Sequence, residues 1–371
     1  MSDLSIDPSS DDAETALAII APLPRPPAGA TAAEVRSWFD ASLAAALPLA
    51  DGSLAAERDA AAAYAQLGKA ENTRRAYRAA VRMWCGWCEQ RGVCPLPASG
   101  PDVAAFLAGE RLRGLTPETL KLRRAAIRYL HRAAGAPVPI DDACVSETLA
   151  GIQRTAARAG ERPRKKKAAT VQVLRRLLEP IGDDLVDLRD RALLLVGFAG
   201  ALRRSELAAI GVADLEATER GMRLILAQTK GSQTEAVTVH LPYGETELCP
   251  VRALERWLAA AGITEGPVFR RIWRAKRAVA GEPPARPRLG TVALTAQTVA
   301  LVVQARAVAA SFGRRELGGH SLKRGALTTG MDRGVHPAKL KRLGRHKSFD
   351  VLGEYLEFGD LFEGHPLTGV L

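Results

Sequence analysis

Three segments of the sequence carry side chains whose types and spacing suit chemistry on an anionic substrate. Residues 201–207 (ALRRSEL) hold two arginines and a glutamate, and residues 319–325 (GHSLKRG) place a lysine one helical turn after a histidine. Residues 343–348 (LGRHKS) hold another histidine, and Tyr355 follows that histidine by nine residues. Cations and N–H donors stabilise negative charge that builds up in a transition state. The set therefore suits a reaction in which an anionic group gains charge.

A buried helix and a hairpin are predicted to position the first segment and a further lysine. Arg189–Ala199 is nearly all apolar, which predicts a helix at the centre of a core. Met222–Gln228 and Glu235–Leu241 alternate apolar and polar residues around the turn TKGSQT. This pattern predicts a β-hairpin with Lys230 in its turn.

Helical geometry predicts how the other side chains are presented. His320 and Lys323 share one face of a helix, whereas Arg324 is rotated from Lys323 by about 100° and should point elsewhere. Ser348 can cap a short helix that leads to Tyr355. Taken one at a time, each of these residues also has an ordinary explanation as a core aromatic, a structural ion pair or a solubilising lysine. Only their occurrence together favours a catalytic site.

In order and spacing these segments resemble the tyrosine recombinase (phage integrase) family, from about residue 60 to the C-terminus. The resemblance implies that Tyr355 attacks phosphorus to form a 3′-phosphotyrosine and that Lys230 protonates the departing 5′-hydroxyl. It implies that Glu206 and Arg324 support the site. The remaining catalytic residues implied by the resemblance are Arg203, His320, Lys323 and His346. No metal, ATP or other cofactor is expected, since the sequence shows no carboxylate cluster with metal-ligand spacing.

Lys323 departs from the family pattern, in which an arginine occupies this position. A lysine keeps the charge but loses the planar fork that binds two phosphate oxygens at once. A catalytically weakened DNA-binding member of the family is therefore one alternative to a site-specific recombinase. A type IB topoisomerase is another, although the two-domain layout and the LGRHKS segment before Tyr355 favour a recombinase.

The pattern along the chain predicts an α+β, mostly helical protein of several parts. Residues 58–156 should form a helical domain, in which one helix ends at Gly92 and another runs from a Thr116 cap to Gly135. The resemblance identifies it as the SAM-like core-binding domain. Four parts are predicted in all, namely a disordered acidic leader (1–57) with a short helix near 32–46, the core-binding domain (58–156), a basic linker (157–169), and a mixed α/β catalytic domain with a small antiparallel sheet and a C-terminal tail (170–371).

Charge indicates a DNA partner. Residues 1–59 have a net charge of −7, whereas residues 60–371 hold 49 basic and 31 acidic residues, a net charge of +18. Two predicted helices carry basic faces, and the linker ends in a lysine run. The residues expected to bind DNA are Arg74, Arg75, Arg78, Lys121, Arg124, Arg128, Lys165, Lys166 and Lys167, with Arg82, Arg123 and Arg132 on the same helix faces.

Composition excludes several other classes of protein. The longest apolar stretch is about half of what spans a bilayer, and five cysteines without a paired pattern suit a reducing compartment. Cys85 and Cys88 are expected to be core thiols. We expect a cytoplasmic, nucleoid-associated bacterial protein. The resemblance implies a tetramer assembled on two duplex DNA sites, with the segment after Tyr355 docked on a neighbouring protomer.

Overall fold

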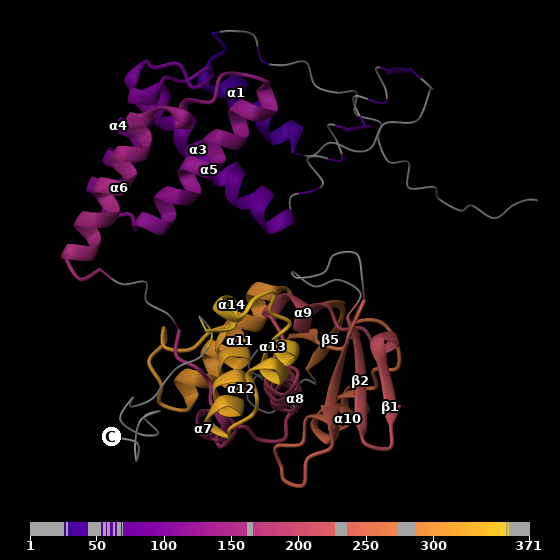
Figure 1. The fold of residues 1–371 in the computed structure, drawn as a ribbon. Helices are drawn as coiled ribbons and strands as arrows, with labels where there is room; N and C mark the ends of the chain where they lie inside the picture. The colour runs from indigo at the N-terminus through magenta and orange to yellow at the C-terminus, as the bar shows by residue number, and fades with distance from the viewer. Residues whose placement is uncertain are drawn as a thin grey trace, which may run out of the picture. The chain divides into compact units, whose positions relative to one another are not determined.

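The computed structural model describes residues 29–43, 70–161, 166–226, 236–273, 287–353 and Tyr355, with a few isolated positions before residue 70. Lys165, Lys230 and the segment after Tyr355 lie outside the described residues. The chain divides into two compact units, Met1–Pro163 and Arg164–Leu371 (Figure 1). Within the described residues, no helix is long and apolar enough to cross a membrane.

The first unit is helical. Its longest helices begin and end where the sequence places caps: Gly92 ends α3 in the left-handed conformation, and α5 runs from a Thr116 side-chain cap to a left-handed Gly135. Trp84, Phe106 and their neighbours form its core. The helices of this unit are α1 (Ala32–Ser42), α3 (Glu71–Arg91), α4 (Gly100–Leu112), α5 (Pro117–Ala134) and α6 (Ala143–Arg158), with a short 3₁₀ helix at Pro139–Asp141.

Helix α1 belongs to this core, which differs from the expectation of a leader that contributes little structure. Val35 and Phe39 are completely buried, and the Phe39 ring meets the Tyr129 ring edge to face at 6.1 Å between centroids. Thr31 and Glu34 form a capping box at its start. The helix is amphipathic, so burial of its apolar face against α3 stabilises it.

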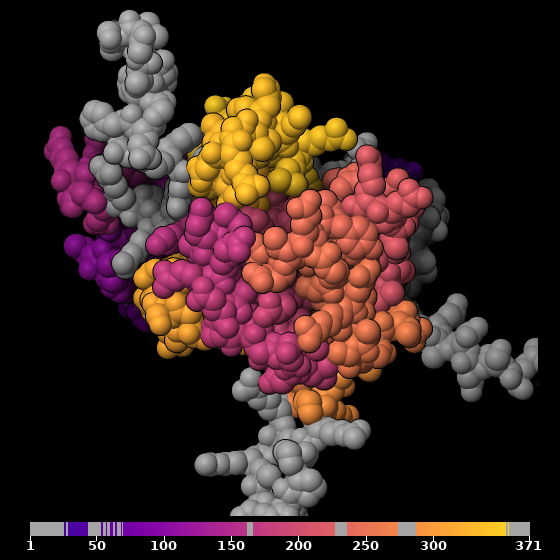
Figure 2. Space-filling model, turned by 90° about the horizontal axis from the view of Figure 1, so that it is seen from below, coloured from indigo at the N-terminus to yellow at the C-terminus, as the bar shows by residue number. Residues whose placement is uncertain are grey.

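The second unit packs helices around two small antiparallel sheets (Figure 1). Helix α8 lies at its centre, because Leu193, Leu194 and Val196 are completely buried. The helices are α7 (Val171–Leu178), α8 (Leu185–Ala199), α9 (Arg204–Ala209), α10 (Pro250–Ala261), α11 (Ala296–Ala309), α12 (Ser321–Asp332), α13 (Pro337–Gly344) and α14 (Phe349–Gly353), with a 3₁₀ helix at Val212–Asp214. Figure 2 shows the magenta and orange parts of this unit in contact at the surface, and α8 packs on α10.

The larger sheet contains the predicted hairpin. Strand β2 pairs with β3 antiparallel, with Leu224 opposite Val239, and it alternates buried and exposed residues as the sequence pattern predicts. The strands of this sheet are β1 (Leu215–Thr218), β2 (Gly221–Leu226) and β3 (Val237–Pro242). The second sheet pairs β4 (Arg270–Trp273) with β5 (Arg288–Ala293).

Candidate active site

Arg203 lies in the short connection between α8 and α9, and its guanidinium is held by Glu206. Glu206 accepts the Arg203 backbone N–H at 2.9 Å and Arg203 Nη1 at 2.6 Å. Burial by itself raises the pKa of the Glu206 carboxyl, but Arg345 and Arg203 outweigh burial and lower it. Glu206 is therefore an anion that orients the arginine from the interior of the unit.

Lys323 lies one turn into α12 and is completely buried. Its ammonium donates a hydrogen bond to the carbonyl of Gly344 and lies 5.7 Å from the centroid of the Tyr355 ring. Burial, reinforced by the charges of Arg203 and Arg345, lowers the pKa of Lys323 to about 7. The structure thus brings this lysine to the tyrosine, and burial tunes its protonation to neutral pH.

His346 follows α13 and packs against Tyr355. The two rings are edge to face, with centroids 4.5 Å apart. Burial and the charges of Lys323 and Arg203 lower the pKa of His346 to about 4, against a small raising effect of the Val351 backbone. Among the described residues, neither ring nitrogen makes a hydrogen bond of normal geometry. A buried imidazole whose nitrogens lack well-formed hydrogen bonds can still bond to a ligand.

Gly344 makes room for the histidine. A Cβ atom at this position would lie 2.3 Å from Cδ2 of the His346 ring, closer than atoms approach. Ser348 caps α14 through its hydroxyl, which accepts the Val351 N–H at 3.3 Å. This cap confirms the predicted start of the helix that leads to Tyr355.

Sequence reasoning assigned no role to Arg345, which connects the parts of this cluster. Its Nη2 donates to Oε2 of Glu206 at 2.8 Å, across 139 residues of sequence. The only signal in the sequence was that an arginine directly precedes His346 in LGRHKS. Among the described residues, Glu206 is the single carboxylate between Arg203, Lys323 and Arg345. The cluster therefore has an excess of basic groups, which attracts an anion.

GHSLKRG holds two further predicted site residues, one exposed and one buried. His320 occupies the N-cap position of α12 and is exposed. The Arg324 guanidinium donates to the carbonyl of Lys166 and, at 3.4 Å, to the backbone carbonyl of Tyr355. Arg324 thus takes a different direction from Lys323, as one residue of helical rotation predicts.

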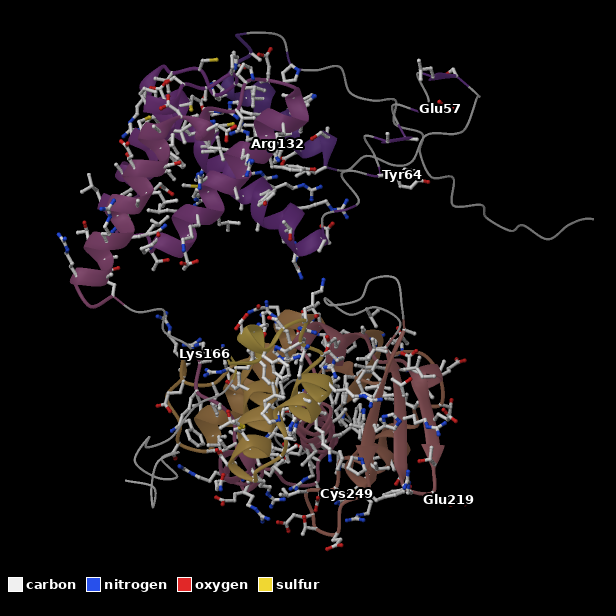
Figure 3. All side chains as sticks on the ribbon, in the orientation of Figure 1. Glu57, Tyr64, Arg132, Lys166, Glu219 and Cys249 are labelled. Atoms are coloured by element: carbon white, nitrogen blue, oxygen red, sulfur yellow. The ribbon has the colours of Figure 1, made fainter. Side chains whose placement is uncertain are left out.

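The described end of the linker is attached to the second unit. The Lys166 ammonium donates to the Arg315 carbonyl, and Lys167 lies 5.8 Å from the centroid of the Phe312 ring. Figure 3 shows Lys166 where the chain enters this unit. Lys166 therefore has a structural partner in the protein, whereas the predicted DNA-binding role of the linker lysines requires an ammonium that is free to reach DNA.

Several arginines on the basic faces of the first unit form ion pairs within the protein, which the sequence pattern did not indicate. Arg74 pairs with Glu71, Lys121 with Glu118, and Arg78 lies 4.0 Å from Glu71. Arg82 pairs with Asp40 and Arg123 with the buried Glu110. Arg75 and Arg128 are exposed, and no described carboxylate forms an ion pair with either. These two are therefore exposed cations of the predicted DNA-binding set without a described carboxylate partner, while Arg124 is half-buried.

The chain is similar in sequence and fold to known proteins. Residues 63–136 match the family model of the phage integrase N-terminal SAM-like domain. The chain is 33% identical over 306 residues to an integrase/recombinase XerD homolog of Selenomonas ruminantium, covering 81% of this chain and 85% of that protein. It is 28% identical to the recombinase Cre of Escherichia phage P1, over 77% of this chain and 84% of that one. The fold is similar to the XerH site-specific recombinase in its post-cleavage complex with a palindromic difH substrate, with a TM-score of 0.58 at 15% identity, covering 91% and 85% of the two chains.

Proposed function

This chain belongs to the tyrosine recombinase family and is a site-specific recombinase that cuts and rejoins DNA, and we propose that the buried cluster of Arg203, Lys323, His346 and Tyr355 is its catalytic centre. One observation carries the assignment. His346 is buried with both ring nitrogens lacking a hydrogen bond of normal geometry, directly against the Tyr355 ring. A phosphate oxygen at this place would satisfy the imidazole and neutralise the excess of cations.

The reaction follows from these side chains. Tyr355 releases its phenolic proton to solvent water and its oxygen attacks phosphorus. The bond from phosphorus to the 5′-oxygen breaks, and a 3′-phosphotyrosine forms. The bond energy is kept in the phosphotyrosine, so rejoining by the 5′-hydroxyl of a DNA strand requires no ATP. The departing 5′-oxygen takes up a proton, for which Lys230 is the proposed donor.

Arg203 and Lys323 stabilise the extra charge on the non-bridging oxygens. Lys323 lacks the arginine fork, but its pKa of about 7 allows it to gain a proton when a phosphate arrives. His346 is neutral in the free protein at neutral pH, because its pKa is about 4. It can therefore donate to a non-bridging oxygen through its single N–H. His320 is proposed to contact the same phosphate from the start of α12.

Duplex DNA is the proposed partner, because the XerH recombinase of similar fold was solved in complex with its difH substrate. Arg75 and Arg128 are proposed to contact its backbone, together with the other basic residues of the first unit that have accessible side chains. Assembly as a tetramer on two sites, with the segment after Tyr355 docked on a neighbouring protomer, extends this proposal. So does a cytoplasmic location at the nucleoid.

Tyr355→Phe tests the assignment of the nucleophile. The target site is first recovered by sequencing DNA fragments that the purified protein retains. On a nicked version of that site, the wild-type protein should form a covalent protein–DNA adduct, and Tyr355→Phe should form none while keeping nearly the same gel-shift affinity. An adduct that persists in Tyr355→Phe would show that another residue attacks the phosphate.

A further inference from the structure

Two residues of the second unit have left-handed backbones that glycine usually adopts, and they meet at the catalytic cluster. Ala201 has φ = 44° and Arg345 has φ = 53°; Ser311, at φ = 64°, is the other non-glycine residue with positive φ among the described positions. Such conformations cost free energy in residues with a Cβ atom. They concentrate where the surrounding structure holds the chain in place for function.

The Arg345 guanidinium joins these two strained turns. Its Nη1 donates to the carbonyls of Gly200 and Leu343, each at 3.0 Å. Its Nη2 donates to the carbonyl of Ala201 at 2.8 Å and to Glu206 at 2.8 Å. One side chain, 8% exposed, therefore ties the turn before Arg203 to the turn before His346.

The backbone alone does not require an arginine here. Arg345 is the residue after α13 and ends that helix in the left-handed conformation, where glycine fits with less strain. What the arginine adds is the guanidinium. Its hydrogen bonds run to the turn before Arg203, and its charge contributes to lowering the pKa of Lys323 and of His346.

We infer that Arg345 is a positioning residue for DNA cleavage, which holds Arg203 in register with His346 and Tyr355. The inference rests on the proposed function, because it assigns a geometry to that catalytic centre. Arg203 and Tyr355 lie 152 positions apart in sequence. Arg345 connects the Arg203 turn, through Glu206 and the 200–201 carbonyls, to the turn that holds His346, and the His346 ring packs against Tyr355. A displacement of about 1 Å between reacting groups costs about 10²-fold in rate.

The test compares Arg345→Met with Arg306→Met. Arg306 is a matched control, since it is a buried arginine of the same unit that binds two carboxylates, Asp187 and Asp190. In single-turnover cleavage of the nicked site, Arg345→Met should lose about 10²-fold, whereas Arg306→Met should cleave at close to the wild-type rate whenever it is folded. Both should retain gel-shift affinity.

A pH profile separates positioning from simple loss of structure. Removing the Arg345 charge should raise the pKa of Lys323, so the fall in cleavage rate with rising pH should move to higher pH in Arg345→Met. General destabilisation lowers the cleavage rate without changing the pH at which the rate falls. Arg345→Lys, which keeps a charge but loses the fork, should fall between wild type and Arg345→Met.

Arg345→Gly keeps the experiment informative if the methionine variant fails to fold. Glycine relieves the backbone strain, so a residue that only ends α13 would be replaced without loss of cleavage. Wild-type cleavage in Arg345→Gly, or an unmoved pH limb in all Arg345 variants, would overturn the inference. Tyr355→Phe, run in parallel, keeps the two questions apart: an adduct in that variant contradicts the proposed function, whereas its absence together with full activity of Arg345→Gly contradicts only the role of Arg345.

Discussion

Two buried clusters of the second unit contain arginines and carboxylates in different proportions. Around α8, Arg189 and Arg306 bind Asp187 and Asp190, so two cations face two anions. At the end of α8, the described residues set Arg203, Arg345 and Lys323 around Glu206. The first cluster is neutral as it stands. The second is complete only when an anion is added, which is the difference between an ion pair that holds a fold and a site that binds phosphate.

The largest expected effect is a loss of DNA cleavage when the cluster around Glu206 is altered but not when the cluster around Asp190 is altered. Arg203→Ala should lower single-turnover cleavage by about 10² to 10³-fold, because one oriented donor to the developing charge is lost. Arg306→Ala should leave cleavage by the folded protein near wild type and instead lower the free energy of unfolding by about 3 to 5 kcal/mol, because it leaves carboxylates buried without a partner. Denaturant unfolding and cleavage assays measure both. Equal loss of cleavage in the two variants would remove the distinction.

Lys323 should make the stability of the protein depend on pH near neutrality. Its pKa falls from 10.5 in the unfolded chain to about 7 in the fold, so the unfolded state binds more protons between these values. The free energy of unfolding should therefore rise as pH increases through this window. Lys323→Met should remove that contribution, as measured by urea unfolding at several pH values. A wild-type curve with the same slope as the variant would show that the lysine keeps its proton in the fold.

DNA binding should return the proton to Lys323. At a pH above about 7 the free lysine is mostly neutral, and a bound phosphate favours its charged form. Titration calorimetry in buffers of different ionisation enthalpy should detect proton uptake of up to about one per protomer in wild type. Lys323→Arg, which is always charged, should show less uptake.

Lys323→Arg also tests whether the missing arginine fork limits the rate of cleavage. Lys323→Arg should cleave faster than wild type at high pH if the larger side chain fits, and Lys323→Ala should be slower. The site is completely buried, so arginine should also cost about 1 to 3 kcal/mol of stability through overpacking. Arg324→Ala is the control, because the Arg324 side chain leaves α12 in a different direction and contacts the Lys166 and Tyr355 carbonyls. It should change the cleavage rate much less than Lys323→Ala does.

The smallest effect concerns cations outside both clusters. Arg75→Ala and Arg128→Ala should each flatten the dependence of log affinity on log salt concentration by up to about 0.9. Lys166→Ala should change this slope less, because its ammonium is already bound to the Arg315 carbonyl. Gel shifts over a range of salt concentrations give the slopes. A larger change in slope for Lys166→Ala than for the two arginine variants would support the predicted DNA contact of the linker lysines.

The sequence by itself determined the features that depend on near neighbours along the chain. The ends of α5 at Thr116 and Gly135, the cap at Ser348 and the alternation of β2 all follow from local hydrogen bonds and side-chain periodicity. The order of the motifs was likewise sufficient to indicate the family. That Lys323 and Arg324 leave α12 in different directions followed from helical rotation alone.

Only the tertiary structure decided which charges meet and which are removed from water. Arg345 reaches Glu206 across 139 residues, and Arg82 reaches Asp40 across 42, so neither pair has a local signal. The neutral-range pKa of Lys323 likewise depends on complete burial beside two arginines. Burial and electrostatic partners are properties of the folded packing, because they depend on every element that surrounds a side chain and not on the residues that flank it in sequence.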